Sequence, residues 1–140
     1  MKKENRSFKI IIDTNIWISF LIGKSLADLQ EYIDSQAVSI ITCDEQLQEL
    51  TEVFRKPKFQ KYFSSEQINE FFELLDESSV NILLKTKTDL CRDSKDNYLL
   101  SLAIDSNADY LITGDNDLLI LEGISNTKII KYIDFDKIYN

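Results

Sequence analysis

Histidine is absent from this chain of 140 residues. Its absence excludes Ser-His-Asp and Cys-His nucleophile activation, imidazole general bases, and metal sites built on histidine nitrogen. Any chemistry must therefore come from carboxylates, hydroxyls or lysines. Carboxylate and hydroxyl oxygens are hard ligands, which favour Mg²⁺ or Mn²⁺ over zinc or copper.

Cysteine, glycine and proline are scarce. The 2 cysteines, Cys43 and Cys91, lack the CxxC spacing of zinc sites, so we expect reduced, structural thiols. With 3 Gly and 1 Pro the chain has little material for flexible linkers, and its 44% hydrophobic and 29% charged residues are typical of a globular protein. We expect residues 1–140 to form one domain with its core over about 8–132.

Long hydrophobic runs are also missing. No apolar run approaches the roughly 20 residues that a helix needs to cross a bilayer. The charged start, Met1 to Ser7, is not followed by the apolar core of a signal peptide. We therefore expect a cytoplasmic protein without a membrane partner.

The net charge of -8 argues against a nucleic-acid partner, because phosphate binding favours a basic surface. Two divalent ions would add +4 and bring this charge to -4. The basic residues are also unevenly spread, since four of them fall together without an intervening acid: Arg55, Lys56, Lys58 and Lys61. This cluster is either a basic rim beside an acidic centre or the solvated end of a helix.

Apolar, strand-like runs alternate with helical patterns along the chain. Strands are predicted over 8–12, 38–42, 80–84, 110–113 and 128–132, the last followed by a brief tail. Helices are predicted over 15–22, 25–35, 44–55, from a capping box at 64–67 towards 78, and over 94–106, with a helical turn at 116–121. The alternation predicts an α/β fold, with a central, mostly parallel sheet flanked by helices and 8–12 as its central strand.

Carboxylates recur where predicted strands stop or helices start. Asp13 follows the first strand directly, Asp93 and Asp96 open the helix near 94, and Asp115 and Asp117 follow the strand that ends at 113. The carboxyl ends of parallel strands converge at one edge of an open sheet. Two carboxylates about 4 Å apart repel by about 4 kcal/mol at an effective dielectric of about 20, which a hard cation turns into attraction. The pattern therefore predicts a site for a divalent cation.

Each of these acids also has a purely structural interpretation. Asp13 could cap the helix that follows it. Asp96 could complement the dipole of its helix, and Asp93 could be the N-cap of that helix. Asp115 and Asp117 could simply form a turn. These interpretations do not explain why three crossovers carry acids at the same edge of the sheet.

The helix predicted over 44–55 carries one more candidate acid. Glu49 stands beside the apolar stripe that includes Leu50 and Phe54, where its carboxylate could turn towards the site. An exposed boundary glutamate is the alternative. Glu45 and Glu52 lie near the same face, so spacing alone does not choose among the three.

These segments together resemble the PIN domain, and more narrowly the PIN-family toxins of bacterial toxin–antitoxin systems. The resemblance extends from Phe8 to about Ile130. It rests on Ile11-Ile12-Asp13-Thr14-Asn15, Glu49-Leu50 with Arg55-Lys56-Pro57-Lys58-Phe59, Asp93-Ser94-Lys95-Asp96-Asn97, and Ala108 to Leu119 with Thr113-Gly114-Asp115-Asn116-Asp117.

The resemblance implies a single PIN-like domain that hydrolyses RNA phosphodiester bonds with water activated by Mg²⁺ or Mn²⁺. It implies the catalytic, metal-binding acids Asp13, Glu49, Asp96 and Asp115, the further metal ligand Asp117, and the supporting residues Asn15, Asp93 and Thr113. A cognate antitoxin and a homodimer are the partners that it implies besides RNA.

Two alternatives come from other classes of protein. A phosphatase of the haloacid-dehalogenase kind also uses an aspartate after its first strand, but it expects a second aspartate where this chain has Asn15. A PIN-like scaffold that binds a partner without cleaving anything is the alternative outside enzymes. A gain in stability on adding Mn²⁺ would separate the metal enzyme from the scaffold.

Overall fold

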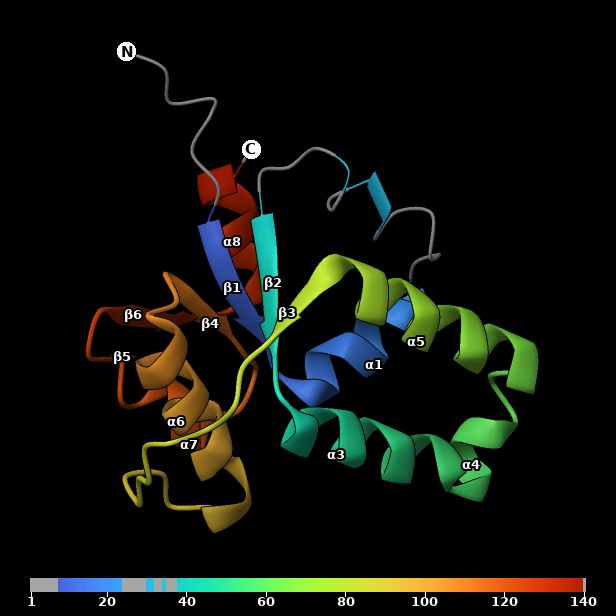
Figure 1. The fold of residues 1–140 in the computed structure, drawn as a ribbon, viewed down its shortest axis with the longest axis horizontal. Helices are drawn as coiled ribbons and strands as arrows, with labels where there is room; N and C mark the ends of the chain where they lie inside the picture. The colour runs from blue at the N-terminus through green and yellow to red at the C-terminus, as the bar shows by residue number, and fades with distance from the viewer. Residues whose placement is uncertain (1–7, 24–29, 32–33, 35–37, 140) are drawn as a thin grey trace.

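A six-stranded sheet lies at the centre of the fold, with the strand order β3-β2-β1-β4-β6-β5 (Figure 1). The computed structural model describes residues 8–23, 30–31, 34 and 38–139. The strands are β1 (Phe8–Ile12), β2 (Val38–Thr42), β3 (Ser79–Asn81), β4 (Tyr110–Ile112), β5 (Gly123–Ile124) and β6 (Thr127–Ile130). All neighbouring strands pair in parallel except β5 and β6, which are antiparallel. The predicted mostly parallel sheet is therefore confirmed, and β1 lies inside it, between β2 and β4.

Helices cover both faces of this sheet. They are α1 (Thr14–Gly23), α3 (Asp44–Arg55), α4 (Pro57–Gln60), α5 (Ser65–Ser78), α6 (Asn97–Ser106), α7 (Asn116–Leu119) and α8 (Tyr132–Tyr139). One buried cluster joins the sheet to α1, α3, α5 and α8, and a second joins the opposite face to α6 and α7. In β1, Ile10 belongs to the first cluster and Ile11 to the second, as the alternation of side chains along a buried strand requires.

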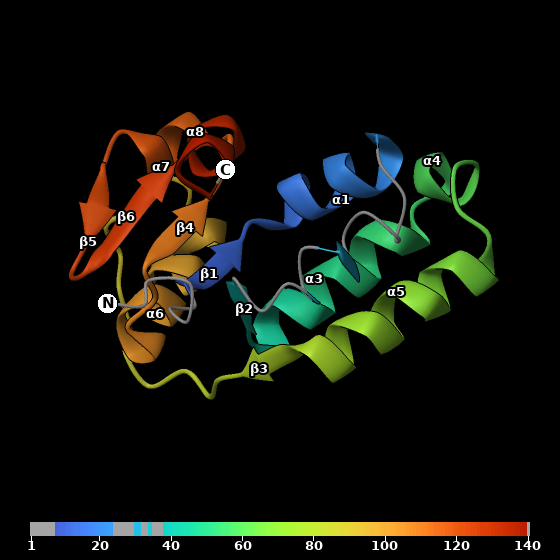
Figure 2. The same ribbon diagram turned by 90° about the horizontal axis from the view of Figure 1, so that it is seen from above.

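The long helices on the first face extend beyond the sheet. Figure 2 shows α1, α3 and α5 running alongside one another, away from the strands. Phe54 on α3 and Phe71 on α5 meet edge to face with their ring centroids 5.7 Å apart, and Trp17 on α1 packs against Phe71 at 5.6 Å. These aromatic contacts hold α3, which carries Glu49, against α1, which starts after Asp13. In the described ranges, no helix combines the length and the apolar character needed to cross a bilayer.

Local signals in the sequence explain several boundaries. Ser64 accepts a hydrogen bond from the backbone of Gln67, whose side chain accepts one from the backbone of Ser64, so the predicted capping box is confirmed. Pro57 follows the end of α3, as predicted, and also opens the short helix α4. Its missing N–H costs nothing in a first helical turn.

Several elements differ from the prediction. The strand predicted over 80–84 is only Ser79–Asn81, and the tail predicted after 132 is the helix α8. The prediction contained no strand at Gly123–Ile124, which pairs with only two residues of β6. The helix predicted over 25–35 lies outside the described residues, apart from 30–31 and 34.

Candidate active site

Asp13 lies at the carboxyl end of β1 and is 5% exposed. Its backbone N–H donates to the carbonyl of Ile112 on β4 at 2.9 Å, which continues the pairing of β1 with β4. One carboxylate oxygen, Oδ1, accepts a 3.4 Å hydrogen bond from the backbone of Asn15 in the first turn of α1. Asp13 therefore caps α1, as its structural interpretation predicted. Its second carboxylate oxygen, Oδ2, accepts a hydrogen bond from Thr113.

Thr113 connects Asp13 to Asp115. Its side chain is fully buried and donates to Asp13 Oδ2 at 2.6 Å, while the same hydroxyl oxygen accepts the backbone N–H of Asp115 at 3.0 Å. Asp115 in turn caps α7 by accepting the backbone N–H of Asp117 at 2.9 Å. One hydroxyl thus links two of the predicted acids, Asp13 after β1 and Asp115 after the paired strand β4.

The negative charge of Asp13 is buried, which costs free energy. Burial raises the pKa of this carboxyl above its ordinary value, while the hydrogen bonds from Thr113 and Asn15 lower it. The negative charges of Glu49 and Asp115 add to the increase. The three acids therefore lie close enough together to affect one another electrostatically.

Asp96 is the most strongly perturbed of these acids. It precedes α6, at the end of a single 3-10 turn (Ser94–Asp96), and its side chain is half-buried. Burial raises its pKa from 3.8 to about 8, with further contributions from a hydrogen bond to Asp115 and from the charges of Asp13, Asp115 and Asp93. The pKa of Asp96 is therefore raised far enough for its carboxyl to keep a proton near neutral pH.

Glu49 is held beside Asp13 by two hydroxyl groups. Thr14 on α1 donates to Glu49 Oε1 at 2.6 Å, and the phenol of Tyr98 on α6 donates to the same oxygen. Burial raises the pKa of Tyr98, and its hydrogen bond to Glu49 raises it further, so the phenol keeps its proton. The other two acids of α3 that the sequence left open, Glu45 and Glu52, are exposed.

Gln46 is a residue that sequence reasoning missed. It is fully buried in the first turn of α3, accepts a hydrogen bond from Thr42 at 2.7 Å and donates one to the carbonyl of Ile12 at 2.6 Å. The carbonyl of Ile12 immediately precedes Asp13, so Gln46 fixes the backbone on which that carboxylate is mounted. Only its position on the buried side of α3 could have marked it in the sequence.

The remaining predicted residues lie at the margin of the site. Asp93 is exposed and caps the 3-10 turn by accepting the backbone N–H of Lys95 at 3.0 Å, which is its structural interpretation. Asn15 contributes its backbone N–H to Asp13 and has an exposed side chain. Asp117 is half-buried in α7, near Cys91, a free and buried thiol whose pKa burial raises and the charges of Asp96, Asp115 and Asp117 raise further.

Oxygen donors dominate this edge of the sheet, which suits Mg²⁺ or Mn²⁺. Within the described part of the chain, no group of three or more Asp, Glu or Cys side chains is already arranged to hold a metal ion. The carboxylates accept hydrogen bonds instead: Asp13 and Glu49 accept two each, and Asp115 accepts one from the backbone of Asp117. The residues therefore fit a divalent metal by donor type and mutual charge.

We expect Asp96 to make the metal-free protein less stable as the pH rises from about 4 to about 8. Its folded-state pKa of about 8 exceeds the ordinary value of 3.8, so in this range the folded chain binds the proton that the unfolded chain has lost. Asp96→Asn should therefore raise the melting temperature at pH 8.5 and change it much less at pH 5. Thermal unfolding in EDTA across this range measures the effect, and an equal gain at both pH values would contradict the raised pKa of Asp96.

Comparison with known proteins assigns a family. Residues 9–117 match the PIN domain model. The uncharacterized protein MJ1680 of Methanocaldococcus jannaschii is 33% identical over 125 residues, which cover 86% of this chain and 79% of that protein. No solved structure matches the chain significantly. The aspartates at the ends of β1 and β4 and at the start of α6 all fall within the matched range, and the chain belongs to the PIN domain family.

Proposed function

We propose that this protein is a divalent-metal-dependent endoribonuclease. PIN domains are generally nucleases, and PIN nucleases typically use divalent metal ions. The observation that carries the proposal is the electrostatic contact of Asp13 with Glu49, Asp96 and Asp115, in a site with no histidine. Carboxylates crowded at one site, with only oxygen donors, suit a cation better than they suit general acid–base chemistry alone.

Asp13, Glu49, Asp96 and Asp115 would hold the metal, with Asp117 at the margin. Bound Mg²⁺ or Mn²⁺ supplies Lewis-acid chemistry, which makes water a better nucleophile and stabilises charge on phosphate oxygens. Thr113 links Asp13 and Asp115 through its single hydroxyl. Asp96 gives up its proton when it becomes a ligand, so metal affinity should increase with pH up to about 8.

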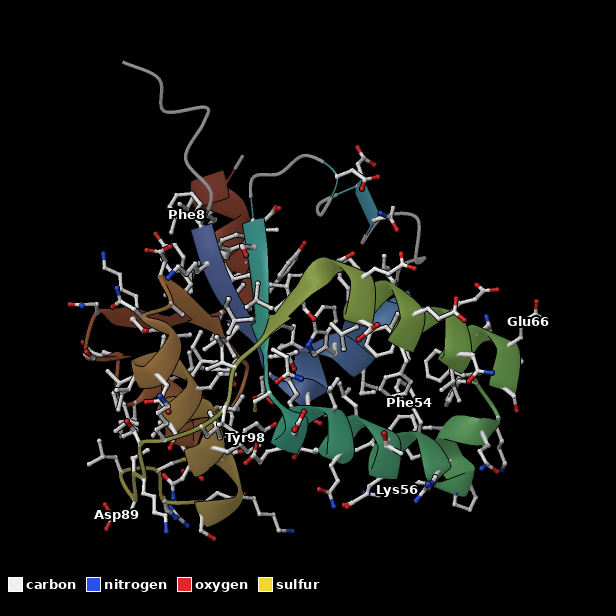
Figure 3. The ribbon with its side chains drawn as sticks, viewed as in Figure 1. Phe8, Phe54, Lys56, Glu66, Asp89 and Tyr98 are labelled. Atoms are coloured by element: carbon white, nitrogen blue, oxygen red, sulfur yellow. The ribbon has the colours of Figure 1, made fainter. Side chains whose placement is uncertain are left out.

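The basic cluster supports RNA as the substrate. Arg55 ends α3 and Lys56 follows as its C-cap, while Lys58 lies on α4 and Lys61 just after it, and all four side chains are exposed. Figure 3 shows Lys56 at the opposite end of α3 from Tyr98. Glu49 and Lys56 are seven positions apart, which is about 10 Å along a helix axis. A strand of RNA crossing the acidic site could therefore reach these cations with neighbouring phosphates.

The first test is the cleavage of a mixed-sequence RNA by the purified protein in Mn²⁺. We expect cleavage that EDTA abolishes and that added Mn²⁺ restores. Para-nitrophenyl phosphate in the same buffer tests the phosphatase alternative. Intact RNA beside a hydrolysed phosphomonoester would favour the phosphatase, and intact substrates of both kinds would favour the PIN-like scaffold.

We further infer a toxin role, which rests on the resemblance to PIN-family toxins. In that role the protein would act on RNA in the cytoplasm, form a homodimer, and be blocked by an antitoxin chain over its acidic site. Growth arrest on expression in a bacterial host, relieved by Asp13→Asn, tests the toxin role. Light scattering of the purified chain measures its oligomeric state, and a monomer at micromolar concentration would rule out the stable homodimer.

A further inference from the structure

Two hydroxyl groups from different helices converge on one oxygen of Glu49. Thr14 Oγ1 donates to Oε1 at 2.6 Å, and Tyr98 donates to the same atom. The two hydroxyl oxygens are 3.3 Å apart. Because each hydroxyl carries a single hydrogen, donation to Glu49 leaves neither of them a hydrogen for the other. Both donors are therefore committed to Oε1.

The second oxygen of Glu49, Oε2, differs from Oε1 in its hydrogen bonding. In the part of the chain that the structure describes, Oε2 accepts no hydrogen bond, and Glu49 is close enough to Asp13 for its charge to act on that carboxyl. A carboxylate has few accessible rotamers when one of its oxygens accepts two hydrogen bonds and the other accepts none. It is pre-organised to offer a single oxygen to a ligand.

We propose that Tyr98 is a positioning residue for the metal site, which holds Glu49 by Oε1 so that Oε2 remains for the cation. This inference rests on the proposed function. Tyr98 suits the task because it lies on α6, two positions after Asp96, whereas Glu49 lies on α3. The hydrogen bond from Tyr98 therefore joins α6, which begins directly after Asp96, to α3, which carries Glu49, across the edge of the sheet.

The phenol hydroxyl can be removed with little change in packing. The Tyr98 ring packs against the buried cluster of α6, and phenylalanine keeps that ring. Tyr98→Phe should therefore fold like the wild type and weaken Mn²⁺ binding by about tenfold to 100-fold, the range typical when a partner that orients a metal ligand is lost. Isothermal titration of the full chain with MnCl₂ measures this dissociation constant without any need for RNA cleavage.

A double-variant cycle with Glu49→Gln tests whether Tyr98 acts through Glu49. If it does, adding Tyr98→Phe to Glu49→Gln should cause no further loss of Mn²⁺ affinity. Tyr110→Phe is the matched control, because Tyr110 lies at the start of β4, where its ring packs against Phe8 and Phe135. The control should bind Mn²⁺ as the wild type does.

The outcomes separate this inference from the function on which it rests. Wild-type affinity in Tyr98→Phe, or a further loss on top of Glu49→Gln, would overturn the role of Tyr98 while leaving the metal-dependent nuclease intact. A wild-type chain that binds no Mn²⁺ would overturn both. A third outcome combines weaker Mn²⁺ binding in Tyr98→Phe with a wild-type protein that cleaves no RNA. This outcome would support the positioning role of Tyr98 and overturn the proposed ribonuclease activity.

Discussion

Asp13→Asn is expected to lower the rate of RNA cleavage by about 10³-fold, which corresponds to about 4 kcal/mol of transition-state stabilisation. The substitution removes the buried charge at the centre of the acidic site and keeps one oxygen, which can accept either from Thr113 or from the backbone N–H of Asn15. The fold should survive, because asparagine serves as an N-cap as well as aspartate does. Single-turnover cleavage of one RNA in Mn²⁺ measures the loss.

Stability separates a catalytic role for Asp13 from a structural one. In EDTA the Asp13→Asn chain should be at least as stable to urea as the wild type, because the variant no longer buries a charge close to Glu49 and Asp115. Asp134→Asn, an exposed change in the first turn of α8, is the control and should retain full activity. Wild-type cleavage by Asp13→Asn, or a large loss of stability, would contradict the proposed role.

Mn²⁺ is expected to stabilise the folded chain by about 2.7 kcal/mol at a hundredfold excess over its dissociation constant. For a chain of 140 residues this corresponds to a rise in melting temperature of roughly 8 °C. The gain arises because the cation binds only the folded chain, where burial and then the charges of neighbouring acids raise the pKa values of Asp13 and Asp96. Thermal unfolding with and without MnCl₂, at pH 8, measures the shift.

The same unfolding experiment contains its own controls. EDTA should reverse the shift, and Asp13→Asn and Asp115→Asn should each abolish most of it, whereas Asp134→Asn should show the full gain. At pH 6 the gain should be smaller, because the cation must then displace the proton of Asp96. A wild-type melting temperature that Mn²⁺ leaves unchanged would argue for the scaffold.

Most of the sheet could be predicted because its strands are short apolar runs that end in polar residues. Phe8–Ile12 is such a run, and it is buried on both faces. The strand predicted over 80–84 was wrong beyond Asn81, because the chain leaves the sheet there. Leu83 there is 77% exposed, and the chain then turns to Asp105, which accepts the backbone N–H groups of Lys85 and Thr86.

The helix α8 could not be predicted because its sequence lacks a clear helical face. Phe135 is its buried apolar residue, at 1% exposure, whereas Ile133 is 60% exposed and Ile138 is 49% exposed. Tertiary contact decides its structure, since the ring of Phe135 packs against Tyr110 of β4 with centroids 5.7 Å apart. The pattern of apolar residues alone does not encode such a contact.

The acids of the site were visible in the sequence because strand ends mark them, but their supporting residues were not. Gln46 contacts Ile12 across 34 positions, and Tyr98 contacts Glu49 across 49. No local pattern signals a hydrogen bond between residues so far apart. Among Glu45, Glu49 and Glu52, only the approach of α1 and α6 to α3 distinguishes the glutamate that faces the site.

The position of β1 between β2 and β4 has a consequence for the order in which a ribosome makes this chain. Asp13 emerges early, whereas Thr113, which holds it, lies 100 positions later. A nascent chain that has not yet released β4 lacks Asp115 and has no partner strand on that side of Asp13. Fragments that stop before β4 should therefore be inert, and the proposed nuclease activity would be acquired late in synthesis.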